Sequence, residues 1–281
     1  MTSAVRIITD SACDLPDSVI RELGIEVVPL FIRFGDEELV DREQLSTDEF
    51  WHRCATEEGL PSTAAPSPGR FEQAISKLVS EGARGVVIID LSGALSGTLQ
   101  SAEVAADGSA ADVRVVDSRT VSMGLGAIVV ACARAARDGA GIDEVERLAR
   151  DLSTRSQVWG ALDTLENLKK GGRIGGAKAL VGTVLSIKPI IEVRDGVVHE
   201  GGRQRTRSKA LGFLVDKVRD CMNKGGGISQ LSVLHAACPD VDSFVEQLRT
   251  VYPGEIMIGQ IGPVVGAHAG RGTIGVAFIQ D

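Results

Sequence analysis

The sequence predicts an α/β protein of two domains, and three observations support that fold class. Through the first half of the 281 residues, short apolar runs alternate with amphipathic segments in the rhythm of strand and helix. The run Gly85–Ile89 is continuously apolar, as in a strand buried on both faces of a parallel sheet. The second half instead places two apolar segments around Asp195-Gly196, a pair that suits a tight antiparallel turn. We therefore expect a mainly parallel α/β domain over residues 1–158 and an α+β domain with a mixed sheet over residues 159–281.

Local signals place the elements of the first domain. Residues 5–9 are an apolar run expected as a strand, and Pro16 is a good first-turn residue for the helix that follows. Ser46 and Glu49 form a capping box that opens another helix, which is predicted to run to about residue 58. The remaining elements are expected as strands at 25–34, 85–91 and 113–116, a helix from Ser67-Pro68 to about Gly82, and helices near 124–138 and 142–155.

The second domain is predicted to open with a hairpin whose strands are 187–194 and 197–200. The elements after it are expected as a helix at 206–222, a strand at 231–235, a helix at 241–250, and strands near 255–261 and 273–279. This mixture of hairpin and strand-helix-strand predicts a partly antiparallel sheet. The change of pattern puts the domain boundary near residues 155–162.

Composition and charge exclude several classes of function. The net charge is −8 and aromatic residues are only 4% of the chain, so neither a basic face nor a stacking platform for nucleic acid is expected. The five cysteines show no CxxC spacing and the four histidines no HExxH pair, so we expect neither a metal site nor a cofactor. No stretch reaches about 18 apolar residues, which predicts a cytoplasmic protein without stable membrane insertion.

Four segments rich in small residues are the candidates for a site: 62–67, 95–98, 169–174 and 262–272. The last of these combines glycines with Pro263 and is expected as a loop, because such a composition is poor in a packed helix or strand. Loops of this kind bring bare backbone close to a partner. His268 stands within it, and we predict a site role for this histidine.

Hydroxyl and guanidinium groups complete the candidate site. Thr63 and Ser96 lie near predicted helix starts, where they could bind an anion or could simply cap the helix, and both interpretations stay open. Arg173 follows two glycines, and Arg205 belongs to the basic run 203–209; arginines in these settings suit a phosphate. A solvated helix end is the alternative, which explains Lys169 and Lys170 well but Arg173 less well. Neither a GxGxxG nor a P-loop motif occurs, so a nucleotide fold is not indicated.

An ordered set of motifs over nearly the whole chain resembles the DegV family. The matching segments are Thr9-Asp10-Ser11, Thr63 with Pro66-Ser67, Leu95-Ser96-Gly97-Thr98, Val116-Asp117-Ser118, Leu168 to Ile174, Lys188-Pro189-Ile190, and Ile261-Gly262-Pro263 with His268, Gly270 and Gly272. No single motif is specific to the family, but the order in which the motifs occur is highly specific. The sequence departs from the family pattern at Ala64-Ala65, Leu99 and Arg271, where Ser-Gln, Tyr and Pro are common.

The resemblance implies a DegV-like fold that holds one long-chain fatty acid between its two domains. It implies a lipid-binding subunit, not an enzyme, that presents the fatty acid carboxyl to a separate ATP-dependent fatty acid kinase. The acyl phosphate product feeds bacterial phospholipid synthesis. By motif, Thr63, Ser96 and His268 would bind the carboxyl, and Arg173 and Arg205 would serve phosphoryl transfer or kinase docking.

Two other functions remain alternatives at the level of sequence. Ser96 and His268 could form a serine acyl-ester hydrolase, although Ser96 stands in Leu-Ser-Gly-Thr and not in a G-x-S-x-G elbow. The same pocket could also serve a lipid-sensing regulatory protein.

Overall fold

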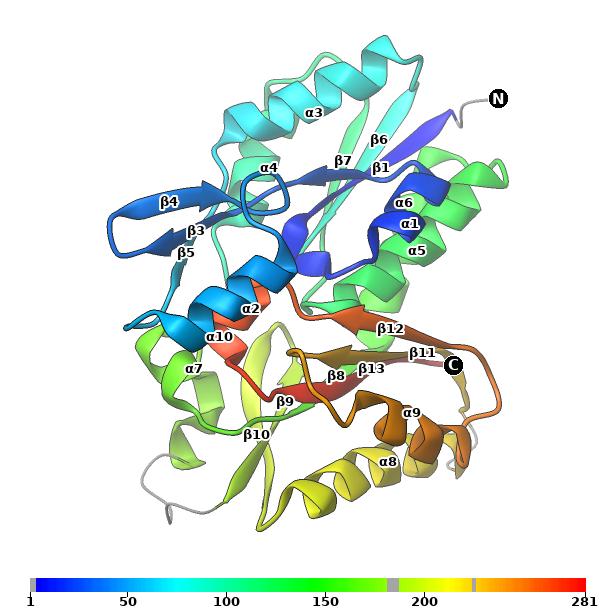
Figure 1. Cartoon of the computed structure of the whole chain (residues 1–281). Helices are drawn as coiled ribbons and strands as arrows, with labels where there is room; N and C mark the ends of the chain where they lie inside the picture. Colours follow the sequence, from blue (N-terminus) through cyan, green and yellow to red (C-terminus); the bar gives the residue numbers. More distant parts are fainter. Residues whose placement is uncertain (1–3, 181–186, 224–225) are drawn as a thin grey trace.

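Three β-sheets organise the part of the chain that the computed structural model describes, residues 4–180, 187–223 and 226–281 (Figure 1). A parallel sheet has the order β2-β1-β6-β7, with β2 at Glu26–Val28, β1 at Val5–Asp10, β6 at Gly85–Asp90 and β7 at Val113–Asp117. A mixed sheet has the order β10-β9-β8-β13-β11-β12, with bounds Val197–Gln204, Lys188–Arg194, Ser156–Ala161, Ile274–Gln280, Ile228–His235 and Ile256–Gln260. A small antiparallel sheet joins β4 (Glu37–Val40), β3 (Phe31–Phe34) and β5 (Ser62–Ala64). The predicted fold class is confirmed.

Alternate residues of β1 enter two different cores, as the two-residue period of a strand requires. Ile8 packs in the cluster that contains Phe71 of α3 (Pro68–Ser80) and Ala102 of α4 (Thr98–Asp107). Ile7 packs on the opposite face, in the cluster that contains residues of α5 (Met123–Arg137) and α6 (Ile142–Arg155). The parallel sheet is therefore covered on both faces. Two further elements, η1 (Ser11–Cys13) and α1 (Asp17–Leu23), follow β1.

The strands of the mixed sheet also send alternate residues into two different cores. Phe278 of β13 packs with α8 (Arg207–Asn223) and α9 (Val241–Arg249), whereas its neighbour Ala277 faces the cluster of α5. Helix α5 thus contacts β1 on one side and β13 on the other. A helix between two sheets must be apolar almost all round, and α5 is buried along most of its length.

Two expectations for the elements were wrong. The strand predicted at 25–34 is two strands in different sheets, β2 and β3, separated by Pro29, which lacks the N–H that a continuous ladder needs. The segment 262–272 was expected as a loop, but it contains the helix α10 (Pro263–Ala269). Pro263 suits the first helical position, and a Cβ on Gly266 would lie 2.6 Å from the Phe50 ring. Glycine there allows α10 to approach α2 (Thr47–Thr56), so it marks close packing and not a loop.

Other expectations are confirmed with small shifts. Ser46 caps α2 by accepting a hydrogen bond from the Glu49 N–H at 3.2 Å. The hairpin of β9 and β10 turns at Asp195-Gly196. The strands β4, β5 and β8 and the short elements α7 (Glu166–Lys170) and η2 (Gly175–Leu180) were not anticipated. The boundary at residue 158 falls within β8 and stays a prediction.

Candidate functional site

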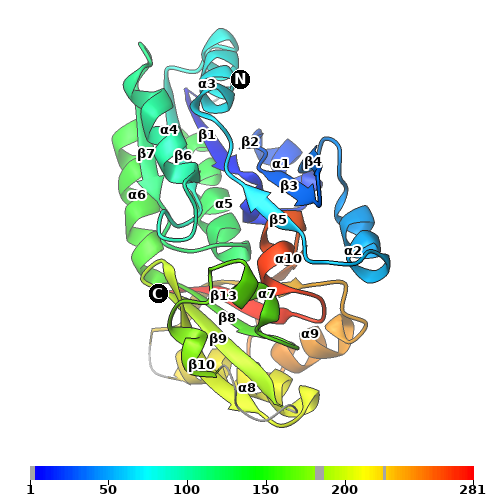
Figure 2. The ribbon, with the colours of Figure 1, turned by 90° about the vertical axis from the view of Figure 1, so that its left-hand side faces the viewer.

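An aliphatic cavity of about 90 Å³ lies between the two halves of the chain. Leu30, Leu91 and Val121 reach it from segments that follow the carboxyl ends of β2, β6 and β7, the edge where parallel sheets usually bind ligands. The opposite walls come from the hairpin of β9 and β10 and from α10, which lies between the upper and lower sheets in both views (Figures 1 and 2). Within the described residues, the polar members of the lining are Thr63, Ser96, Arg173 and His268. These are four of the five residues that the sequence analysis selected.

Thr63 and His268 are joined directly. The Thr63 Oγ1 and the His268 Nε2 are 3.0 Å apart, although 205 residues separate them in the sequence. Burial, and then the nearby positive charge of Arg173, lowers the pKa of His268 to about 4, so the imidazole is neutral at pH 7. Its Nδ1 is buried without a hydrogen-bond partner among the described residues. Thr63 lies on β5, and the N-cap of the next helix is Ser67, so the capping interpretation of Thr63 is wrong.

A missing side chain makes room for the imidazole ring. A Cβ on Gly171 would lie 2.2 Å from the His268 Nδ1, far inside van der Waals contact. Asn167 of α7 fixes α10, the helix that carries His268, by donating from its Nδ2 to the Ala267 carbonyl at 3.1 Å. The small-residue segment 169–174 therefore shapes the His268 pocket.

Ser96 lies just before a helix and lines the cavity. Its Oγ accepts from the Thr98 N–H at 3.3 Å and lies 2.9 Å from the Thr98 Oγ1, at the start of α4. The N-cap residue of α4 is Gly97, so Ser96 bonds to the first turn without being its N-cap. Within the described chain, no hydrogen bond joins Ser96 to His268, so the pair that a serine hydrolase needs is not formed.

Arg173 ties two loops together beside the cavity. Its Nε donates to the Leu95 carbonyl at 2.9 Å and its Nη1 to the Gly171 carbonyl at 2.8 Å. A second, more open hollow of about 370 Å³ shares Ser96 and Arg173 with the aliphatic cavity, and glycines form much of the rest of its wall. These two residues therefore stand between an apolar cavity and a polar hollow that opens to solvent.

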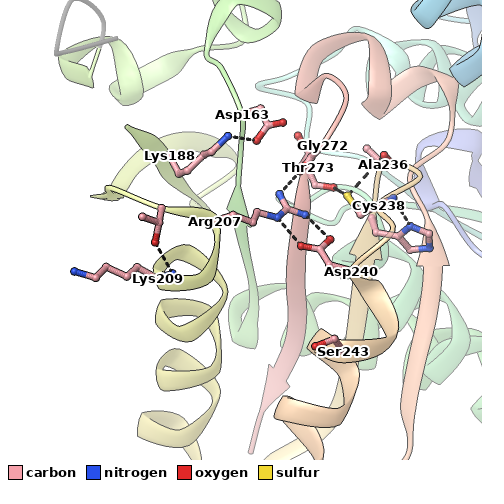
Figure 3. A network of polar contacts seen from close by, with 12 residues as sticks. Asp163, Lys188, Arg207, Lys209, Ala236, Cys238, Asp240, Ser243, Gly272 and Thr273 are labelled. Carbon is pink, nitrogen blue, oxygen red and sulfur yellow. Dashed lines mark hydrogen bonds and ion pairs between the residues drawn. The ribbon is translucent and has the colours of Figure 1, made fainter. Parts of the chain in front are cut away.

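Arg205 is not brought to the cavity. It is exposed, in the turn between β10 and α8, and lines neither hollow. Arg207 is the basic residue of this run with a defined structural role. Its guanidinium pairs with both Asp240 carboxylate oxygens at 2.9 and 3.0 Å and donates to the Gly272 carbonyl (Figure 3). This network holds the turn that follows α10, and nothing in the sequence distinguished Arg207 from its neighbours.

A group of acids is buried around the cavity loops; the sequence singled out Asp10, within Thr9-Asp10-Ser11, but gave no signal for Asp14. Asp10 accepts from the Leu91 N–H at 2.7 Å, and burial raises its pKa to about 6. Asp14 accepts from the Ser122 hydroxyl at 2.5 Å and the Gly262 N–H at 2.9 Å, and burial raises its pKa to about 7. Asp14 therefore anchors the start of α10. An Asp-Ser pair after a strand was the available signal for Asp10, but it is also the ordinary signal of a helix cap.

No group of three or more His, Cys, Asp or Glu residues is arranged to hold a metal ion within residues 4–180, 187–223 and 226–281. Over the same ranges, no helix combines the length and apolarity that crossing a membrane requires.

Comparisons with known proteins agree with the ordered motifs. A family model described as an uncharacterised protein of the DegV family matches residues 4–281. A DegV domain-containing protein of Streptomyces coelicolor is 35% identical over 279 residues, with 98% of each chain covered. A relative from Deinococcus radiodurans is 36% identical over 277 residues, again with 98% of each chain covered.

Solved structures agree as well. A DegV family protein from Thermus thermophilus, described as binding fatty acid, has a TM-score of 0.91 at 30% identity over 99% of both chains. A DegV lipid-binding protein from Thermotoga maritima has a TM-score of 0.89 at 26% identity over 98% of both chains. On sequence and fold together, the chain belongs to the DegV family.

Proposed function

We propose that this protein binds one long-chain fatty acid, with the alkyl tail in the aliphatic cavity and the carboxyl group at Thr63, Ser96 and His268. The observation that carries the proposal is the composition of the cavity wall. Its walls are aliphatic except for four polar residues. Thr63 contacts His268, and Arg173 donates to the Leu95 carbonyl beside Ser96. A tail with one acidic end matches that distribution.

The energetics favour such a ligand. Each buried CH₂ contributes about 0.8 kcal/mol, so a 16-carbon tail can supply on the order of 10 kcal/mol before ordering costs. A carboxylate removed from water must be hydrogen-bonded, and the hydroxyls of Thr63 and Ser96 supply donors. Burial of the tail would supply most of the affinity, and the contacts of the head group would fix the position of the ligand.

The neutral state of His268 sets the direction of its hydrogen bond. Thr63 has one hydroxyl proton, and it can give that proton to a carboxylate only if its oxygen accepts from the imidazole. We therefore assign the proton of His268 to Nε2 in the loaded state. An unprotonated Nδ1 fits this assignment, since Nδ1 makes no hydrogen bond among the described residues.

We further propose that a partner fatty acid kinase phosphorylates the bound carboxyl group. A carboxylate oxygen would attack the γ-phosphorus of the kinase's ATP, the bond to ADP would break, and an acyl phosphate for phospholipid synthesis would remain. The open hollow beside Ser96 and Arg173 offers a route for the phosphoryl group, whose charge Arg173 would stabilise. Exposed Arg205 would serve docking. This role requires no cofactor and places the protein in the cytoplasm.

The test of this function is the affinity for a fluorescent long-chain fatty acid in two matched variants. Thr63→Val removes the proposed donor and should weaken binding about tenfold or more, the usual cost of a lost hydrogen bond to a charged group. Thr9→Val is the control, because the buried Thr9 hydroxyl has no partner among the described residues and lies outside the cavity lining. Equal affinities in the two variants would contradict the assignment. Acyl-ester hydrolysis that disappears in Ser96→Ala would instead support the hydrolase.

A further inference from the structure

Ser92 joins the loop that carries Ser96 to the hairpin that walls the cavity. It is fully buried, two residues beyond the end of β6. Its Oγ donates to the Gly196 carbonyl at the tip of the β9–β10 hairpin at 2.7 Å. A Cβ on Gly196 would lie 2.5 Å from that Oγ, so the contact depends on a residue without a side chain.

The same residue organises the carboxyl-binding loop. The Ser92 carbonyl accepts from the N–H groups of Leu95 at 3.0 Å and Ser96 at 3.2 Å. Its Oγ also accepts from the Ala94 N–H at 3.2 Å, and its own N–H donates to the Thr120 carbonyl at 2.9 Å. A shift of Ser92 would therefore move Ser96, the proposed carboxyl ligand.

The hairpin held by this bond is part of the cavity wall. Ile191, Val193 and Val198 line the cavity, and β10 is an edge strand of the mixed sheet. Beside the Ser92 bond, the hairpin tip makes an exposed ion pair between Arg119 Nη2 and Asp195 Oδ1 at 2.7 Å. The buried bond is the stronger of the two ties, because exposed pairs contribute little.

We infer that Ser92 is a positioning residue for lipid binding, which fixes Ser96 and holds the hairpin closed over the alkyl tail. This inference rests on the proposed fatty-acid function. Loss of the Ser92 hydroxyl leaves the Gly196 carbonyl without its donor and frees the tip of the wall. The bound lipid then leaves faster, whereas a purely structural serine would change only stability.

The test compares Ser92→Ala with Ser118→Ala in the full chain. Ser118 is an equally buried serine in the loop after β7, but the bonds of its Oγ to described residues are local, with Thr120. A fluorescent long-chain fatty acid is displaced by excess unlabelled oleic acid and its dissociation rate is measured. Ser92→Ala should raise that rate about tenfold, as expected for one unmade buried hydrogen bond, and Ser118→Ala less than twofold. Equal rates in the two variants would overturn the inference.

A second measurement needs no ligand. Hydrogen exchange of residues 191–198 should be faster in Ser92→Ala than in Ser118→Ala, with exchange in β11 unchanged. Unaltered hairpin exchange would overturn the inference while leaving the proposed function intact, whereas wild-type protein that binds no fatty acid would overturn the proposed function and the inference with it. Should Ser92→Ala fail to fold, Arg119→Ala at the exposed ion pair replaces it, with an expected two- to threefold rise in the dissociation rate.

Discussion

The two ends of the cavity are built on different principles. The tail end is walled by many aliphatic side chains from several elements, among them Leu30, Val193 and Val264, and each supplies a small part of the apolar surface. The head-group end depends on single atoms, such as the Thr63 Oγ1 beside the His268 Nε2. Apolar burial is non-directional, whereas a hydrogen bond needs one geometry. The tail end should therefore tolerate substitution and the head-group end should not.

Substitution of Arg173 should have the largest effect, and the affected property is kinase-coupled turnover. Arg173→Ala is expected to lower kinase-coupled turnover 100- to 1000-fold, because it removes the cation nearest the proposed phosphoryl group. Fatty acid affinity should fall only a few-fold, through loss of the bond to the Leu95 carbonyl. A coupled kinase assay and equilibrium binding on the same preparation measure the two effects. Equal loss of affinity and turnover would reject this division of roles.

The glycine that accommodates His268 comes next. Gly171→Ala introduces a Cβ 2.2 Å from the His268 Nδ1 and should displace the ring, which weakens binding about 10- to 100-fold. Gly97→Ala is the control, since a Cβ there meets no atom within 4 Å and the backbone is not left-handed. Titration with a fatty acid compares the two. If both variants bind alike, the ring is not part of the head-group site.

Substitutions in the aliphatic wall around the alkyl tail should weaken binding only slightly. Val193→Ala and Val264→Ala each remove a little apolar surface from the cavity, and each should weaken fatty acid binding by only about three- to tenfold. Calorimetric titration measures this. A loss as large as that in Gly171→Ala would show that the tail end is as demanding as the head-group end.

The buried acids and His268 should have opposite effects on folding stability as the pH changes. Burial raises the pKa of Asp14 from 3.8 to about 7, so its contribution to stability is complete below pH 3.8 and is lost as pH rises through 7. The pKa of His268 is lowered from 6.5 to about 4, so its contribution is complete above pH 6.5 and is lost as pH falls through 4.

Substitution of Asp14 isolates the first of these effects. Asp14→Asn keeps an acceptor for the Gly262 N–H and suits the left-handed backbone there, with φ at 52°. It should remove roughly 2 kcal/mol of the destabilisation that wild type shows between pH 5 and 7, the amount that such a pKa shift implies. Urea unfolding at both pH values measures the difference. An unchanged pH dependence would exclude Asp14 as its source.

The sequence located the polar residues of the cavity better than the backbone that carries them. His268 lines the cavity, but the sequence predicted a loop for it, because glycine and proline usually end helices. The tertiary contact of Gly266 with Phe50 and Trp51 reverses that rule, and no local pattern reveals it. Thr63 was likewise placed before a helix, although it lies on β5, whose partner strand β3 was merged with β2 in the prediction.

Long-range contacts explain what sequence reasoning missed. Asp14 accepts a hydrogen bond from the Gly262 N–H at the start of α10, 248 residues later, whereas an aspartate near a helix start otherwise indicates a cap. Ser92 acquires its role from a hairpin 104 residues away. Local periodicity located most strands and helices, but it carries no signal for such pairs.

Native mass spectrometry of the purified full chain, followed by lipid extraction, tests the central claim most directly. The account predicts one long-chain fatty acid per chain, lost or exchanged more readily in Thr63→Val than in Thr9→Val. A chain that carries no lipid and takes up none when a fatty acid is added would contradict it.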